Sequence, residues 1–172
     1  MSEQQQQQQQ QQQLVDLIDD HDLETFVILY QQISTNLKSF EHVELLLRAC
    51  RFGTVPFVQC ILNNNLIIDV NCRHPSTGFS PLFIAIRAQN YEIIEYSIQE
   101  TQADINCRFQ TNTTCLHEAL RQRDLVTIEL LLERSVTVDE SHLFAVIIEC
   151  FRGEINKVFL FYYKIIYVLS FI

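Results

Sequence analysis

The residues of this sequence that could perform chemistry are mainly cysteines and histidines in its middle part. Cys72, His74, Cys107, Cys115 and His117 are of the types that bind zinc. Zinc holds each sulfur at about 2.3 Å, so two of its ligands must lie within roughly 4 Å of each other. None of the six cysteines belongs to a C-x-x-C pair. A metal site therefore depends on whether the fold brings Cys72 and Cys107 together.

Asp139, Ser141 and His142 are the residue types of a catalytic triad. Neighbouring residues on a helix do not face each other, and the sequence has no G-x-S-x-G nucleophile elbow. We therefore predict that His142 starts a helix and that the protein is not an enzyme.

A second candidate is an acidic run that could suggest calcium: Asp16, Asp19, Asp20, Asp22 and Glu24. It lacks the loop pattern of a calcium site and lies on an apolar helical pattern, which predicts a solvated helix face.

Composition excludes further classes of function. The 172 residues include 12 Lys+Arg against 21 Asp+Glu, a formal charge of -9, which predicts no binding to nucleic acid. The sequence has only three glycines, so it contains no glycine-rich phosphate-binding loop. The start of the chain has no basic or apolar secretory signal, so we expect a cytoplasmic or nuclear protein with free thiols.

A repeated pattern runs through the middle of the chain. Asp69–Arg73 reads D-V-N-C-R and returns 35 residues later as D-I-N-C-R at Asp104–Arg108. Ser80–Ile86 reads S-P-L-F-I-A-I and returns 34 residues later as T-C-L-H-E-A-L at Thr114–Leu120. Such a fixed period predicts repeated structural units rather than a general helical bundle.

Each repeat is expected to form two short helices. Ile93, Ile94, Ser97 and Ile98 lie on one helical stripe, and Ile128 belongs to a matching stripe in the next repeat. One helix pair is too small to bury its apolar face alone, so neighbouring pairs must stack.

This stacking bears on the zinc question. Stacked helices lie about 8–10 Å apart. Cys72 and Cys107 occupy equivalent positions in successive repeats, so they cannot share a zinc ion. We predict no metal and no cofactor.

The sequence resembles the ankyrin repeat family at S-P-L-F-I-A (80–85), at T-C-L-H-E-A (114–119) and at the D-V-N and D-I-N turns. The resemblance implies an all-α fold, an α-solenoid of stacked helix-turn-helix repeats, about four, with a degenerate N-terminal half repeat. The expected divisions are a disordered poly-Gln tail (1–13), a capping repeat (14–44), ankyrin repeats (45–161) and a hydrophobic C-terminal tail (162–172).

The family also places a glycine between the two helices of a repeat, where a positive φ is needed. Gly53 and Gly153 fit this position. The other two repeats have Gln89-Asn90 and Arg123-Asp124 there, and Asn and Asp tolerate the left-handed conformation. The resemblance further implies a hydrogen bond between Thr114 and His117.

The resemblance implies a non-enzymatic protein–protein interaction module, in which turn fingers and first helices form a concave binding face. The residues expected to bind a partner are Arg73, His74, Arg87, Arg108, Phe109, Gln110, Arg121 and Gln122, with Arg51, Phe52, Ser76 and Asn112 beside them. Five of these twelve are arginines, whereas residues 14–47 hold seven acids and one base. We therefore expect a basic strip beside an acidic N-terminal cap, and a partner with an acidic segment.

Two other functions remain open from the sequence. Residues 155–172 are strongly apolar and could tether the protein to a membrane, although a spanning helix needs about 20 apolar residues and Lys164 interrupts this run. The repeats could also serve as an adaptor in a larger assembly such as a ubiquitin ligase.

Overall fold

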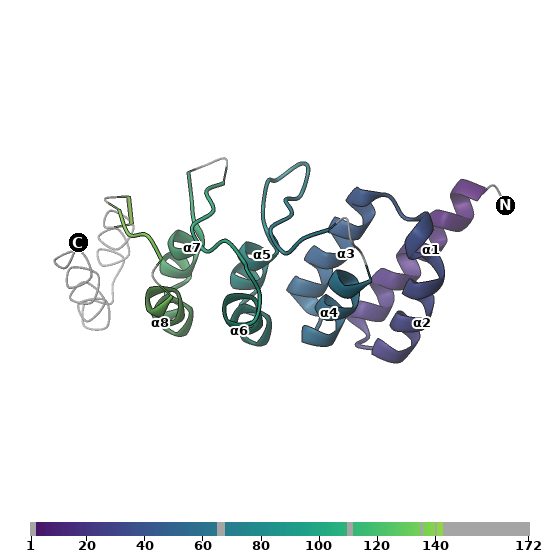
Figure 1. Cartoon of the computed structure of the whole chain (residues 1–172), viewed down its shortest axis with the longest axis horizontal. Helices are drawn as coiled ribbons and strands as arrows, with labels where there is room; N and C mark the ends of the chain where they lie inside the picture. The colour runs from purple at the N-terminus through teal and green to yellow at the C-terminus, as the bar shows by residue number, and fades with distance from the viewer. Residues whose placement is uncertain (1–2, 65–67, 110–111, 135, 140, 143–172) are drawn as a thin grey trace. The chain divides into compact units, whose positions relative to one another are not determined.

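The computed structural model describes residues 3–64, 68–109, 112–134, 136–139 and 141–142. These residues form α-helices, one short 3-10 helix and connecting loops, without a strand (Figure 1). The chain divides into two compact units, residues 1–104 and 105–172. The predicted all-α class is confirmed, and each unit is described by itself below.

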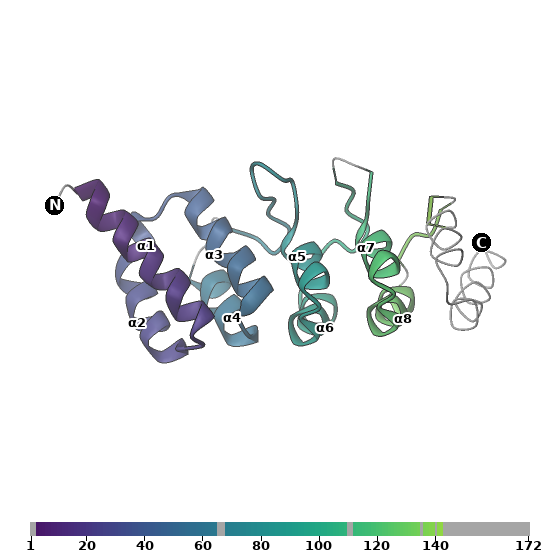
Figure 2. The same cartoon turned by 180° about the vertical axis from the view of Figure 1, so that it is seen from behind.

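The first unit contains three helix pairs. They are α1 (Glu3–Asp19) with α2 (Leu23–Ile33), α3 (Ser39–Phe52) with α4 (Val55–Asn63), and α5 (Pro81–Ala88) with α6 (Tyr91–Gln99). A 3-10 turn, η1 (Ser34–Asn36), follows α2. Because α3 packs on both α1 and α5 while α4 packs on both α2 and α6, the pairs stack in two layers (Figures 1 and 2).

Aromatic side chains join the first two pairs. Phe26 on α2 stacks on Tyr30 with ring centroids 5.5 Å apart and meets Phe57 on α4 edge-on at 5.1 Å. The Tyr30 hydroxyl donates to Nδ1 of His42 at 2.8 Å, and Nε2 of His42 donates to the Ser34 carbonyl at 3.1 Å. Burial lowers the pKa of His42, so the ring is neutral at neutral pH. Both of its ring nitrogens have a hydrogen-bond partner.

The N-terminal region differs from the expected disordered tail and half repeat. The glutamines lie in α1, which is continuous from Glu3 to Asp19. Leu14 and Ile18 are fully buried, so packing fixes the end of this helix and the glutamines extend it at no further nucleation cost. Glutamine itself is a good helix former. With α2 this makes a complete pair, and α3 begins at Ser39, within the segment assigned to the cap.

The turns between paired helices use different residues from those we expected. Gln89 (φ 56°) and Arg123 (φ 57°) take the left-handed conformation, whereas Asn90 and Asp124 are the N-caps of the following helices. Gly53 has a φ of -87°, so the expectation of a positive φ there is wrong. Position 53 has no room for a side chain, because an added Cβ would lie 2.9 Å from the Ala49 carbonyl oxygen.

Replacing Gln89 with glycine is expected to stabilise the first unit by about 1 kcal/mol, since glycine adopts the left-handed region without the Cβ penalty. Urea unfolding measures the difference. Asn90→Gly is the matched control: its φ is -83° and its side chain donates to the Gly53 carbonyl at 3.0 Å, so that change should destabilise. Stabilisation by both changes would contradict the explanation.

The described part of the second unit contains one helix pair, α7 (Cys115–Gln122) and α8 (Leu125–Glu133). Residues 105–109 and 112–114 lead into α7, and residues 136–139 and 141–142 follow α8. Ala119 is fully buried on α7, in the position that Ala85 occupies on α5 of the first unit. The predicted fourth repeat and the hydrophobic tail (162–172) lie almost wholly outside the described residues.

Candidate protein-binding groove

A groove of about 440 Å³ lies in the first unit between α3, α5 and the loop of residues 68–80. The loop projects beyond the helices and returns to α5 (Figure 1). The residues lining the groove are Leu47, Arg51, His74, Thr77, Phe79, Ile84, Arg87 and Ala88. Below, "the inner groove" means the surface formed by these residues.

The inner groove combines apolar and cationic side chains. Leu47 and Ile84 supply aliphatic surface from the two helices, and the Phe79 ring stacks on Phe83 with centroids 4.6 Å apart. The Arg87 guanidinium carbon lies 5.6 Å from the Phe79 ring centroid, and that of Arg51 lies 4.7 Å from the ring of Phe52. Each aromatic ring thus restrains a guanidinium group, which leaves less side-chain entropy to lose on binding.

His74 organises the loop that forms one wall. Its Nδ1 accepts hydrogen bonds from the backbone N–H of Ser76 at 3.3 Å and of Thr77 at 3.2 Å. Its own backbone pairs with Phe79 and Gly78, the latter at φ 69°. The proton of a neutral ring is therefore on Nε2, which lies 3.9 Å from a carboxylate oxygen of Glu44. His74 both lines the groove and fixes its shape.

A second hollow of about 270 Å³ continues the inner groove toward α1. It shares Leu47, Arg51, His74 and Ile84 with it and adds Val15, Glu44 and Arg48. Arg48 forms an ion pair with Asp19, so its charge is offset. Within the described residues Arg51 forms no ion pair, and it lines both hollows. The positive end of the surface is therefore near Arg51 and Arg87, and the acidic end is near Glu44.

The structure distributes the predicted binding residues unevenly. His74 and Arg87 line the inner groove together with Arg51, while Arg73 is exposed outside the lining. Gln110 lies outside the described residues. The lining also contains the apolar residues Leu47, Ile84 and Phe79, which were not predicted. Leu47 and Ile84 each lie one helical turn before a groove arginine, and Phe79 precedes the N-cap of α5, which were the signals that could have indicated them.

Apart from Gln110, four of the eight predicted binding residues belong to the second unit, and the structure gives them contacts within that unit. The Phe109 side chain is only 5% exposed, so it packs inside the fold and is not presented to a partner. Arg121 donates to both carboxylate oxygens of Glu118, at 3.0 and 2.6 Å, and Gln122 donates to the same carboxylate at 2.9 Å. Since Glu118 is buried, these contacts satisfy its charge.

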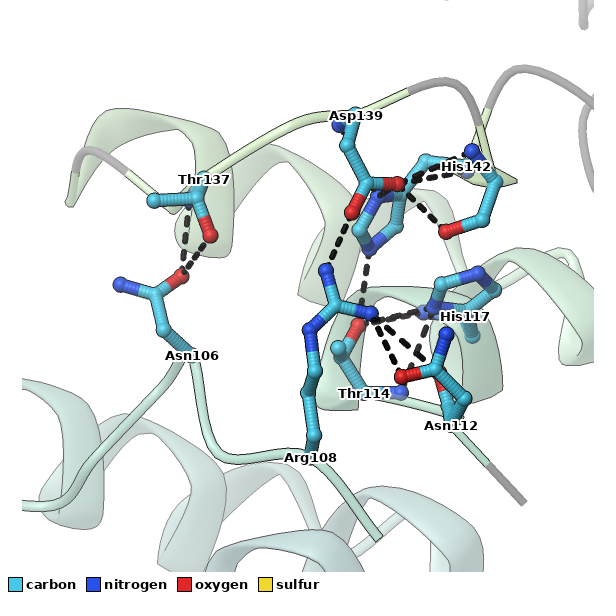
Figure 3. A network of polar contacts seen from close by, with 9 residues as sticks. Asn106, Arg108, Asn112, Thr114, His117, Thr137, Asp139 and His142 are labelled. Carbon is cyan, nitrogen blue, oxygen red and sulfur yellow. Dashed lines mark hydrogen bonds and ion pairs between the residues drawn. The ribbon is translucent and has the colours of Figure 1, made fainter.

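Arg108 belongs to a polar network in the second unit (Figure 3). It forms an ion pair with Asp139 and donates to the side-chain oxygen of Asn112 at 3.1 Å. Asn106 accepts hydrogen bonds from the backbone N–H of Thr137 at 2.7 Å and from its hydroxyl at 2.9 Å. These contacts join the loop before α7 to the segment after α8.

The same network brings the triad-like residues together, contrary to our expectation that they do not face each other. Asp139 and Ser141 do contact each other through a hydrogen bond, and Nδ1 of His142 lies 2.9 Å from the same carboxylate. The other ring nitrogen of His142 bonds the Thr114 hydroxyl at 2.8 Å rather than Ser141. His142 is fully buried and Thr114 is 3% exposed, so this chain of hydrogen bonds fixes the turn.

The predicted bond between Thr114 and His117 is confirmed at 3.0 Å. The rings of His117 and His142 lie 3.9 Å apart between centroids. Burial, reinforced by the neighbouring His117, lowers the pKa of His142 to about 4. Burial raises the pKa of Asp139, but hydrogen bonds from Ser141 and Arg108 outweigh this effect and hold that pKa well below its usual range.

The cysteines of the described residues are free thiols: Cys50, Cys60, Cys72, Cys107 and Cys115. Burial raises the pKa of Cys72 to about 11, so its thiolate is scarce at neutral pH. Across the described ranges, no three His, Cys, Asp or Glu side chains are placed to share a metal ion.

The helices of the described residues are too short or too polar to cross a bilayer. The apolar residues 155–172 lie outside the described residues.

Comparison with known proteins agrees with this geometry. A family model described as ankyrin repeats (3 copies) matches residues 19–109 and again residues 46–142. No match was found among curated proteins. Since the two matches together cover more than half of the sequence, and the described residues form helix pairs joined by projecting loops, the chain belongs to the ankyrin repeat family.

Proposed function

We propose that the first unit binds a protein segment that carries acidic side chains, and that it does so in the inner groove. Ankyrin repeats are protein–protein interaction modules and typically act as non-enzymatic scaffolds. The observation that supports this particular partner is the pair Arg51 and Arg87 beside the aliphatic residues Leu47 and Ile84.

The chemistry of the groove favours carboxylates flanked by apolar residues. A guanidinium group donates two parallel hydrogen bonds to a carboxylate, and such charge-assisted bonds are stronger than neutral ones. A volume of about 440 Å³ holds a few side chains, and Leu47 and Ile84 would contact their apolar parts. Arginine and aromatic residues are also the types that dominate binding energy at interfaces.

The charge distribution also sets a direction for the bound segment. Glu44 and helix α1, which carries Asp16 and Asp19, lie beyond one end of the inner groove, and Arg87 lies on α5 at the other. Because like charges repel, the acids of the partner should lie toward α5 and its uncharged residues toward α1.

The test is peptide selection followed by affinity measurement. Peptides selected from a random library on the full chain should be enriched in Asp or Glu next to aliphatic residues. Arg51→Glu with Arg87→Glu is expected to weaken the best peptide about 100-fold, since each lost charged hydrogen bond is worth roughly 1.5 kcal/mol or more. Fluorescence anisotropy measures the dissociation constant.

Arg134→Glu is the control, because Arg134 is an exposed arginine outside the inner groove and its replacement makes the same change of charge as either single substitution in the groove. It should leave the affinity within about twofold. Equal weakening by the control, or full binding by the double variant, would refute the proposed site.

We further propose, from the sequence, a cytoplasmic or nuclear location.

A further inference from the structure

The first helix pair carries a second, separate groove. It has a volume of about 510 Å³, lies between α1 and α2, and shares no lining residue with the inner groove. The lining residues are Gln13, Asp16, Leu17, Thr25, Ile28, Leu29 and Gln32. We call this surface the N-terminal groove.

The N-terminal groove exposes aliphatic side chains on the side of α2 that faces away from the core. Helix α2 buries Phe26, Tyr30 and Ile33 on one side, yet it also presents Ile28, which is 59% exposed, and the half-buried Leu29. A helix that is apolar on two sides is typical of a position between two packed neighbours. Among the described helices of the first unit, however, the α1–α2 pair has its main contacts with the α3–α4 pair.

The end of a repeat array normally presents a polar outer surface, because no further repeat covers it. Here the end of the first unit presents Leu17, Ile28 and Leu29 instead. Exposed apolar patches bordered by polar residues mark binding surfaces. The groove therefore lies where a further helix pair of the array would pack.

The charge around the N-terminal groove restricts what can bind there. Between residues 5 and 33 the chain has five acidic residues and no lysine or arginine. Asp16 lines the groove itself, while Asp19 is engaged with Arg48 on α3. A second copy of this chain would set acids against acids, whereas a basic partner would be attracted.

From this apolar floor and acidic border we propose that the N-terminal groove binds an amphipathic helix of another protein, with an aliphatic stripe flanked by lysines or arginines. A helix is the fitting shape because two antiparallel helices form the groove, and a third helix packs into such a depression at about 8–10 Å. The aliphatic stripe would cover Leu17, Ile28 and Leu29, and the basic flank would lie near Asp16.

The test uses designed helical peptides and the full chain. One peptide carries leucines at every third or fourth position with lysines on both flanks; a second has glutamates on the flanks; a third has the residues of the first in an order without a stripe. The lysine peptide is expected to bind at least tenfold more tightly than either of the others, as measured by fluorescence anisotropy.

Two variants locate the binding surface. Ile28→Gln should weaken the lysine peptide about tenfold, whereas Val126→Gln, which replaces a residue 64% exposed on α8, should leave its affinity unchanged. Asp16→Lys should weaken the lysine peptide several-fold and strengthen the glutamate peptide.

Three results would overturn the proposal. They are equal affinity for the striped and stripeless peptides, equal effects of Ile28→Gln and Val126→Gln, and self-association of the full chain that Ile28→Gln abolishes. The last result would identify a second copy as the occupant. Because the two grooves share no residue, Arg51→Glu with Arg87→Glu should not change lysine-peptide binding, so the two proposals fail separately.

Discussion

Replacement of Phe26 by alanine is expected to lower the free energy of unfolding of the first unit by about 4 kcal/mol. The ring is fully buried, stacks on Tyr30 and meets Phe57 edge-on, so its removal loses burial, leaves a cavity and breaks the contact between α2 and α4. Urea unfolding followed by circular dichroism measures this loss as a lower midpoint.

Phe40→Ala is the matched control for that experiment. It is the same chemical change in the same unit, but Phe40 is 47% exposed on α3. Its cost should stay below about 1 kcal/mol. If both changes cost the same, the aromatic contact between the first two pairs does not hold them together as described.

Acidification from pH 6.5 to pH 4 is expected to destabilise the second unit by about 3 kcal/mol. His142 has a pKa lowered from 6.5 to about 4 in the folded chain, mainly by burial. In this window the unfolded chain binds a proton that the folded chain does not. The stabilising contribution of neutral His142 is therefore fully present above pH 6.5 and falls by about 1.4 kcal/mol for each unit by which the pH is lowered. Burial also lowers the pKa of His117, which adds to the loss.

Asp139 does not offset this effect. Its pKa is lowered from 3.8 in the folded chain, so its contribution to stability is retained throughout the window and lost only at lower pH. Hydrogen exchange of residues 106–139 at several pH values reports on the second unit alone. It therefore separates the effect of His142 from that of His42 in the first unit. The variant His142→Gln should flatten the pH dependence between 4 and 6.5, and an unchanged slope in this variant would contradict the assignment.

The repeated motifs predicted the fold because they encode contacts that are local or lie one repeat away. Thr114 and His117 are three residues apart and bond as expected, and Asn71 and Asn106 both receive backbone hydrogen bonds from the following linker. The glutamine run offered no apolar pattern of its own, so its helical state could not be read from it. Burial of Leu14 and Ile18, which depends on α3, supports that helix.

The binding residues were only partly predictable. Basic residue types at finger and first-helix positions indicated His74 and Arg87, which line the inner groove. The same reasoning selected Arg121, which forms an ion pair with Glu118 three residues earlier on α7. A sequence shows which side chains carry charge, but the three-dimensional contacts decide which charges are already neutralised inside the fold.

The asparagine turns determine where this chain can be shortened. The Asn71 side chain donates to the Gln102 carbonyl at 3.0 Å and accepts from the Asp104 amide at 2.7 Å. The Asn106 side chain accepts hydrogen bonds from the backbone and the hydroxyl of Thr137. A fragment ending at Gln99 would contain all six helices of the first unit yet leave Asn71 without either bond. Truncation after Asp104 retains both, so a workable terminus lies beyond the last helix, in the connector of the next repeat.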